Sequence, residues 1–367
     1  MNSPASRRPA PRAAPAALAA WLLAALLLAA APAAPAAAGG AKPRPLYWGA
    51  VIGKQLTGEA APWDMGAIDA FERSAGKGIS LLGFSSPFFD CGERPCTPFH
   101  FPTRAMEDLR ARGTIPFLSW GSQAVPGEVE QPAFRLAAVA RGDHDAYVTE
   151  FAEQAAEWGR PFFLRFDAEM NGFWFPWGAS VNGNTPRDFV AAWRHVHDIF
   201  QRAGATKATW VWCPNVDFTR KLVPLASLYP GHRYVDWTCL DGFNWGRTAN
   251  SVGWQTFDQI FRSTYRRVVR IAPRKPMVIG EVASEERGGS KPGWIRHMLN
   301  AIPRRYKKVR AVIWFNERDQ GMHWPIESSR RSRNAFRKGI ARAIYRPNVF
   351  SELPARRIEP PGPNLAR

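Results

Sequence analysis

The sequence predicts a single (β/α)8 barrel, and three observations lead to this fold class. Eight short apolar runs suited to strands begin 29 to 47 residues apart, which is the length of one strand, one helix and two loops. Amphipathic stretches lie between these runs. No G-x-G-x-x-G motif follows the first run, which disfavours a doubly wound open sheet, the alternative fold. The expected strands are residues 46–52, 79–84, 114–120, 161–166, 208–213, 237–245, 276–281 and 309–315.

The expected helices carry apolar residues along one side and polar residues along the other. Residues 146–158, 186–202 and 257–271 are the clearest examples. Thr185 followed by Pro186 is a typical helix start, a capping residue before a proline in the first helical position. Eight strand and helix units together predict the barrel, in which functional residues lie where the strands end.

The chain of 367 residues divides into three expected parts. Residues 1–38 are typical of an export signal, with Arg7 and Arg8 before an apolar stretch and a small-residue cleavage site ending at Ala38. Residues 39–345 form the barrel, and residues 346–367 form an extension rich in Pro and Arg that wraps the barrel or is partly disordered. We expect a secreted or periplasmic protein with no stable membrane insertion after cleavage; an uncleaved single-span anchor is the alternative.

The formal net charge is +18, which would suit an anionic partner. The basic residues are spread along the chain, apart from a late cluster at Arg330, Arg331, Arg333, Arg337 and Arg342. No nucleic-acid-binding module surrounds this cluster, so we expect no nucleic-acid partner. A basic cell-wall or nucleic-acid binder stays an alternative, and its affinity would fall steeply with salt.

The four cysteines fit two disulfides in an oxidising compartment. Cys91 and Cys96 would close a tight loop, and Cys213 and Cys239 lie near the ends of two consecutive expected strands. Free buried thiols are the alternative for the second pair. We expect no metal site, because neither pair has C-x-x-C spacing and no histidines cluster with them.

Two glutamates stand at strand ends on opposite sides of the expected barrel mouth. Glu169 follows the fourth strand and Glu281 closes the seventh. Hydrolysis of a glycosidic bond with retained configuration needs two carboxyl groups roughly 5 Å apart, one protonated and one ionised. Aromatic residues directly follow Glu169, and such flat apolar faces suit sugar rings.

The stretch from Arg165 to Trp177 contains Glu-Met-Asn-Gly-x-Trp-x-x-Trp, beginning at Glu169. This motif resembles the acid/base motif of glycoside hydrolase family 26, the retaining β-mannanases and their relatives. Glu281, the Asp-Gly-Phe-Asn-Trp stretch at 241–245 and Trp314 follow in the family's order, and the resemblance runs from about Tyr47 to Tyr345.

The resemblance implies that Glu169 is the general acid/base and Glu281 the nucleophile. It implies an activity like that of a mannan endo-1,4-β-mannosidase, with no metal or organic cofactor. Mixed-linkage β-glucan, xylan and exopolysaccharide are alternative substrates. Trp174 and Trp314 would stack on sugars, and Arg165 would support the site. The full set of expected substrate-binding residues is Trp120, Arg165, Asn171, Trp174, Trp177, Phe243, Asn244, Trp245 and Trp314.

Two residues depart from the family pattern. Ala168 stands where the family usually has His, and Phe243 stands where a Tyr hydroxyl usually bonds the nucleophile. Losing that donor would raise the pKa of the nucleophile unless Asp167, Asn244 or a water replaces it. A carbohydrate-binding barrel that has lost turnover is therefore the alternative function.

Overall fold

The computed structural model describes residues 44–93, 95–218, 223–248 and 252–362. The expected signal segment, residues 1–38, lies outside the described residues, so its interpretation stays a prediction. None of the helices formed by the described residues is long and apolar enough to cross a membrane.

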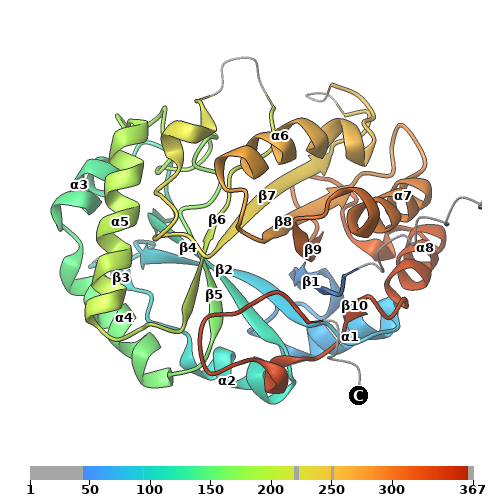
Figure 1. Ribbon diagram of the computed structural model, residues 1–367, viewed down its shortest axis with the longest axis horizontal. Coiled ribbons are helices and arrows are strands. Elements are labelled where there is room, and N and C mark those ends of the chain that lie inside the picture. The colour runs from blue at the N-terminus through green and yellow to red at the C-terminus, as the bar shows by residue number, and fades with distance from the viewer. Residues whose placement is uncertain (1–43, 94, 219–222, 249–251, 363–367) are drawn as a thin grey trace, which may run out of the picture. The chain divides into compact units, whose positions relative to one another are not determined.

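Eight parallel strands close into a barrel, because β1 (Leu46–Ile52) pairs with both the second and the last barrel strand. The helices surround this barrel (Figure 1). The predicted (β/α)8 fold is therefore confirmed. The other barrel strands are β2 (Leu81–Asp90), β4 (Ile115–Val125), β5 (Phe162–Phe166), β6 (Ala208–Trp212), β7 (Trp237–Asn244), β8 (Met277–Ser284) and β9 (Val309–Asn316), with β3 (Thr97–Pro98) antiparallel to β2 and β10 (Tyr345–Arg346) parallel to β1.

The helices follow the predicted amphipathic stretches. Thr185 caps α5 through a reciprocal capping box with Asp188, as the Thr-Pro signal predicted. Between β6 and β7, where the spacing is shortest, the described residues form a 3-10 turn, Leu225–Leu228, in place of an α-helix. The helices are α1 (Met65–Ala75), α2 (Thr103–Ala111), α3 (Leu136–Arg141), α4 (Asp145–Trp158), α5 (Pro186–Arg202), α6 (Phe257–Ile271), α7 (Lys291–Arg305) and α8 (Arg330–Ile340).

Side chains alternate between the barrel interior and the helix layer along each strand. On β9, for example, Ala311 and Ile313 belong to an inner cluster, while Val312 and Trp314 belong to the larger cluster that includes the helices. This alternation decides which strand-end residues can face the mouth of the barrel.

Three strands continue several residues past the ends expected from sequence. β2 and β4 stay paired up to Asp90 and Val125, so the expected loops begin as strand. β8 runs on to Ser284 and does not stop at Glu281, because a one-residue bulge at Gly280 resets its pairing with β7. A Cβ atom at Gly280 would lie 2.6 Å from the Cys239 sulfur, so only glycine fits there.

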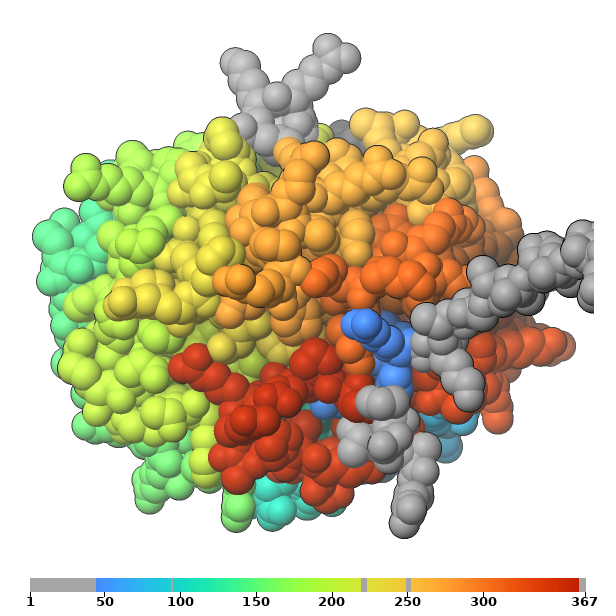
Figure 2. Space-filling model, viewed as in Figure 1, coloured from blue at the N-terminus to red at the C-terminus, as the bar shows by residue number. Residues whose placement is uncertain are grey.

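The C-terminal segment packs across the amino-terminal ends of the strands. The Trp237 indole donates to the Ile358 carbonyl at 2.8 Å, and the Ile358 amide donates to Thr209 Oγ1 at 2.8 Å. Ile358 is buried in the inner cluster. Figure 2 shows the segment in red on the face turned toward the viewer. The described part of the extension therefore closes the end of the barrel away from the strand ends that carry Glu169 and Glu281.

Replacing Ile358 by alanine should lower the free energy of unfolding by about 2–4 kcal/mol, because it removes buried apolar atoms that seal the barrel. Denaturant unfolding monitored by tryptophan fluorescence measures this loss. Arg356→Ala serves as the control, because its ion pair with Glu359 is exposed. Equal stability of Ile358→Ala and Arg356→Ala would show that the segment does not close the barrel.

Candidate active site

A tight turn directly after β5 carries Glu169. Asp167 and Glu169 have φ values of 41° and 57°, in the left-handed region that non-glycine residues seldom occupy. The turn is fixed at one end by Asp167, whose carboxylate accepts from the Ser122 amide and hydroxyl, both at 2.8 Å. The Glu169 amide donates to the Cys213 carbonyl at 2.6 Å, which fixes the turn against β6. This strained turn holds Glu169 at the carboxyl end of the barrel.

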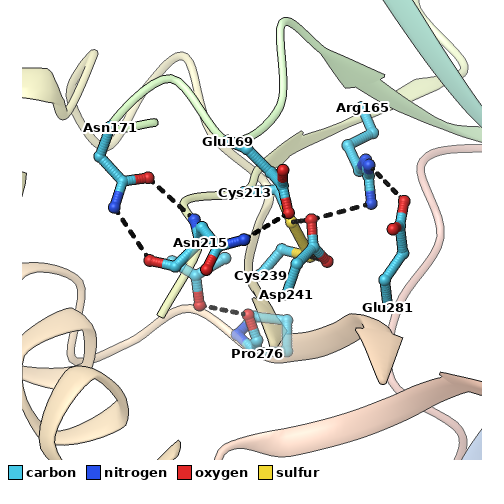
Figure 3. The surroundings of a disulfide bond; sticks show 10 residues. Arg165, Glu169, Asn171, Cys213, Asn215, Cys239, Asp241, Pro276 and Glu281 are labelled. Atoms are coloured by element: carbon cyan, nitrogen blue, oxygen red, sulfur yellow. Dashed lines mark hydrogen bonds and ion pairs between the residues drawn. A yellow bond between two sulfur atoms is a disulfide. The ribbon is translucent and has the colours of Figure 1, made fainter. Parts of the chain in front are cut away.

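The Glu169 carboxyl group has a hydrogen-bond donor on each oxygen. Asn215 Nδ2 donates to Oε1 and Trp174 Nε1 donates to Oε2, both at 2.6 Å. Asn215 is itself held by Asn171, since Asn171 Oδ1 accepts from the Asn215 amide and Asn171 Nδ2 donates to the Asn215 carbonyl. Asn171 therefore acts on the carboxyl group through Asn215, as the left side of Figure 3 shows.

Glu281 faces the same space from β8 and pairs with a buried arginine. Arg165 Nη2 donates to Glu281 Oε1 at 2.7 Å, and Arg165 Nη1 lies 3.1 Å from Asp241 Oδ2. Figure 3 shows the Arg165 guanidinium between these two carboxylates, with Glu169 on the other side of Asp241. Arg165 is the donor to Glu281 that Phe243 cannot be.

Neither Asp167 nor Asn244 replaces the missing Tyr hydroxyl as a donor to Glu281, so this expectation was wrong for both residues. Asp167 is bonded to Ser122, and the Asn244 side chain donates to Ser284 Oγ and accepts from the Gln255 amide. Asn244 is fully buried, so it shapes the β7 end and does not face the mouth.

The surroundings of the buried carboxyl groups shift their pKa values. Burial, together with the nearby Glu281 charge, raises the pKa of Glu169 to about 7. Burial also raises the pKa of Asp241 well above its usual value, although Arg165 opposes this. For Arg165 burial acts to lower the pKa, and the Asp241 and Glu281 charges outweigh it and raise the pKa. The arrangement thus lets Glu169 hold its proton up to a pH of about 7, beside Glu281, which is paired with Arg165.

A disulfide lies directly beneath these groups. Cys213, directly after β6, is bonded to Cys239 within β7, and Cys91 and Cys96 are bonded as well, as the sequence suggested. Cys213, Cys239 and Asp241 lie close enough for a metal site, but both sulfurs are used in the disulfide, which removes the thiolate ligands. The disulfide instead fixes β6 and β7, which carry Asn215 and Asp241.

Aromatic side chains flank both glutamates. On the Glu169 side, Trp174 packs against Phe173 and Phe218 with ring centroids 5.2 and 4.8 Å apart, and Phe173 is 56% exposed. On the Glu281 side, Phe243 packs against Phe315 at 5.4 Å. Trp324 contacts Phe243 and the 37% exposed Trp245 at 5.2 and 5.1 Å. These two aromatic groups can take sugar rings on either side of the carboxyl groups.

Three of the expected substrate-binding tryptophans lie in the core. Trp120 and Trp314 are each 1% exposed and sit at outward positions of their strands: Trp120 stacks on Phe151 and Trp314 packs on Phe336. Trp177 is 5% exposed and donates to the Ala168 carbonyl. A sugar cannot stack on these rings in this arrangement, so we leave Trp120, Trp177 and Trp314 out of the proposed binding surface.

Sequence reasoning missed several residues that the fold brings to the mouth. The sequence does not distinguish Phe315 from Trp314; in the structure Ile313 belongs to the inner cluster and Trp314 to the outer one, so alternation turns Phe315 toward the inner side. Asn215 follows the expected strand at 208–213 and Asp241 lies in the 241–245 stretch, but their residue types alone indicate no role. Phe218 carried no signal beyond its place in the loop after β6.

A barrel with two glutamates at its carboxyl end, one with a raised pKa and one paired with an arginine, and with aromatic rings on either side, suits the hydrolysis of glycosidic bonds. Comparisons with known proteins agree. The family model described as glycosyl hydrolase family 26 matches residues 140–290, a segment that includes both glutamates. The resemblance predicted from the sequence is thereby confirmed.

Endoglucanase H of Acetivibrio thermocellus is 39% identical over 212 residues, which are 57% of this chain and 23% of that protein. Mannan endo-1,4-beta-mannosidase of Bacillus subtilis is 26% identical over 164 residues, which are 43% of this chain and 40% of that protein. The chain thus spans less than half the length of either relative.

Among solved structures, the catalytic domain of the family 26 endo-beta-1,4-mannanase from Bacillus sp. JAMB-750 has a TM-score of 0.62 with 17% identity. The match covers 86% of this chain and 92% of that one. At this identity the likeness concerns the fold.

Glu169→Gln should become more stable relative to wild type as the pH rises from 5 to 8. The pKa of Glu169 is about 7 in the folded protein and lower in the unfolded chain. As the pH rises between these two pKa values, the unfolded chain releases this proton and the folded protein does not, so wild type loses stability. Glutamine does not titrate, so the variant avoids this loss. Thermal unfolding at several pH values measures the difference.

Glu285→Gln is the matched contrast. Burial acts to raise the pKa of Glu285, but hydrogen bonds from Arg287 and His323 outweigh it and lower the pKa to about 2. Its carboxylate stabilises the fold above the unfolded pKa and loses this effect as the pH falls toward 2, so Glu285→Gln should lower stability at neutral pH. The same pH trend in both variants would contradict the assigned environments.

Proposed function

We propose that this protein is an exported retaining O-glycosyl hydrolase that cleaves a β-linked polysaccharide. The observation that carries the proposal is the pair formed by Glu169, with its raised pKa, and Glu281, held by Arg165. The family match and the named relatives support the same reaction class. The signal-like N-terminus and the two disulfides support export.

In the first step the Glu281 carboxylate attacks the anomeric carbon, the glycosidic bond breaks, and Glu169 donates its proton to the leaving oxygen. In the second step Glu169, now ionised, takes a proton from water. The water oxygen then attacks the anomeric carbon, and the bond to Glu281 breaks. Two inversions leave the configuration retained.

Arg165 and Asp241 act on the charge balance of this cycle. The Arg165 guanidinium stabilises Glu281 while it is ionised and again as it departs in the second step. The bond between Glu281 and the sugar removes the negative charge near Glu169, which lowers the pKa of Glu169 and suits it to act as a base. The buried pair with Asp241 holds the guanidinium in place.

Two substrates are to be compared, a β-glucan and a mannan. The similarity to Endoglucanase H is higher and covers more of this chain than the similarity to the mannan endo-1,4-beta-mannosidase. This favours a β-glucan, including mixed-linkage glucan. The likeness to mannanases in fold and motif supports mannan or glucomannan.

Glu169→Ala and Glu281→Ala should each lower kcat/KM by at least about a thousandfold, because each removes a reacting group. Reducing-sugar release from mannan, β-glucan, xylan and an acidic exopolysaccharide measures the activity and identifies the substrate. Proton NMR of the first product should show the β-anomer.

Glu157→Ala, on the exposed side of α4, is the control and should keep full activity. If wild type binds these glycans but releases no reducing ends from any of them, the protein is a carbohydrate-binding barrel and the hydrolase proposal is wrong for these substrates.

Trp174→Phe should move the basic limb of the kcat/KM profile to higher pH. The indole hydrogen bond favours the ionised form of Glu169, so its removal raises the pKa of Glu169, and the protonated acid persists to higher pH. Steady-state kinetics across the pH range measure the limb. Trp245→Phe, which alters the other aromatic group, should leave the limb in place; a basic limb that stays unchanged in Trp174→Phe would contradict Glu169 as the acid.

A further inference from the structure

The outer faces of α7 and α8 carry basic residues and no acidic ones. The two helices pack side by side on one side of the barrel (Figure 1). Arg305 is paired with Asp258, and Arg337 packs against Gly76. We use the name α7–α8 basic face for the exposed basic residues that take part in no ion pair between described residues, which are Arg296, Arg304, Arg330, Arg331, Arg333 and Lys338.

The charge on this face is not explained by a uniform excess of arginine. α4, across the barrel in Figure 1, has the opposite composition, with four acidic residues and no basic one: Asp145, Glu150, Glu153 and Glu157. Positive charge is therefore concentrated on one side of the molecule, which produces a long-range field directed from that side.

The basic residues of α8 also lie where they oppose the helix. Arg330, Arg331 and Arg333 are within its first four residues, and the first turn contains no acidic residue. Positive charge at a helix N-terminus is unfavourable, because the unpaired N–H groups there already carry partial positive charge. The Glu286 carboxylate accepts from Ser332 Oγ at this end of the helix and offsets part of this cost. A single carboxylate does not balance three arginines, so local helix stability does not account for all of them, and such conflicts between local preference and sequence are typical of functional surfaces.

We propose that the α7–α8 basic face binds an acidic polysaccharide that carries carboxylate groups, such as a polymer of uronic acid. A guanidinium pairs a carboxylate through two parallel hydrogen bonds, so arginine suits this anion. The charges are spread along two helices and do not converge in a pocket, which fits a polymer with repeating charges.

The surroundings of the face disfavour insertion into a membrane. The large exposed apolar side chains among the described residues, Trp63, Phe173, Trp245 and Val252, all lie outside α7 and α8. The face is on the outer side of the helix layer. Arg330, Arg331 and Arg333 lie at the end of α8 nearest the barrel mouth, because Ser332 Oγ at that end donates to Glu286, which follows β8. The proposal does not depend on hydrolysis at that mouth.

The test is binding of the full chain to polygalacturonate at increasing NaCl concentration, with a neutral glucomannan as the reference polymer. Arg330→Glu, Arg331→Glu and Arg333→Glu are combined in one variant. The matched control combines Arg104→Glu, Arg160→Glu and Arg187→Glu, which change the net charge equally at exposed positions on α2, before β5 and on α5.

Wild type and control should bind polygalacturonate with an affinity that falls with salt, and the α8 variant should bind at least about tenfold more weakly. The α8 variant should stay folded, which its thermal unfolding checks, because the three substituted side chains are exposed. Binding that is unchanged in the α8 variant, or weakened equally in the control, overturns the proposal. Tighter binding of wild type to anionic lipid vesicles or DNA than to polygalacturonate also overturns the proposal. A third contrary result is an α8 variant that loses self-association but still binds the polymer.

Discussion

The ion pair of Arg165 with Glu281 and Asp241 is the interaction on which the rest of the site depends. Its guanidinium lies 2.7 Å from one carboxylate and 3.1 Å from the other, and it is almost fully buried. Without this cation, two carboxylates would face each other and Glu169 in a space of low polarity, at a large energetic cost. With the cation in place Glu281 and Asp241 share one guanidinium, and the raised pKa of Glu169 lets that group hold its proton up to a pH of about 7.

The barrel supplies this pairing through four neighbouring strands. Arg165 is on β5, and its partners come from β7 and β8, so the guanidinium reaches across the interior. β6 and β7 are joined by the disulfide, and the bulge at Gly280 brings the β8 backbone against Asp241 and the Cys239 sulfur. The C-terminal segment closes the far end of the barrel, and the disulfide and the bulge fix the strand ends. Both features hold the carboxyl groups in fixed positions relative to one another.

The fold and the two glutamates could be predicted because they depend on patterns along the chain, namely strand spacing and the place where an apolar run ends. The orientation of Trp120 and Trp314 could not, because strands buried on both faces are apolar at every position and do not show which side faces inward. The donor to Glu281 could not be predicted either. It depends on how β5 and β8 face each other across the barrel, which local sequence does not record.

The central claim is that Glu281 attacks the sugar while Glu169 serves as acid and base. Incubation with 2,4-dinitrophenyl 2-deoxy-2-fluoro-β-glycosides of cellobiose and mannobiose, followed by peptide mass spectrometry, tests it most directly, because the fluorine slows release of the covalent intermediate. The account predicts one modified peptide with the sugar on Glu281. A sugar found on Asp241, or an active enzyme that forms no adduct and releases product of inverted configuration, would contradict it.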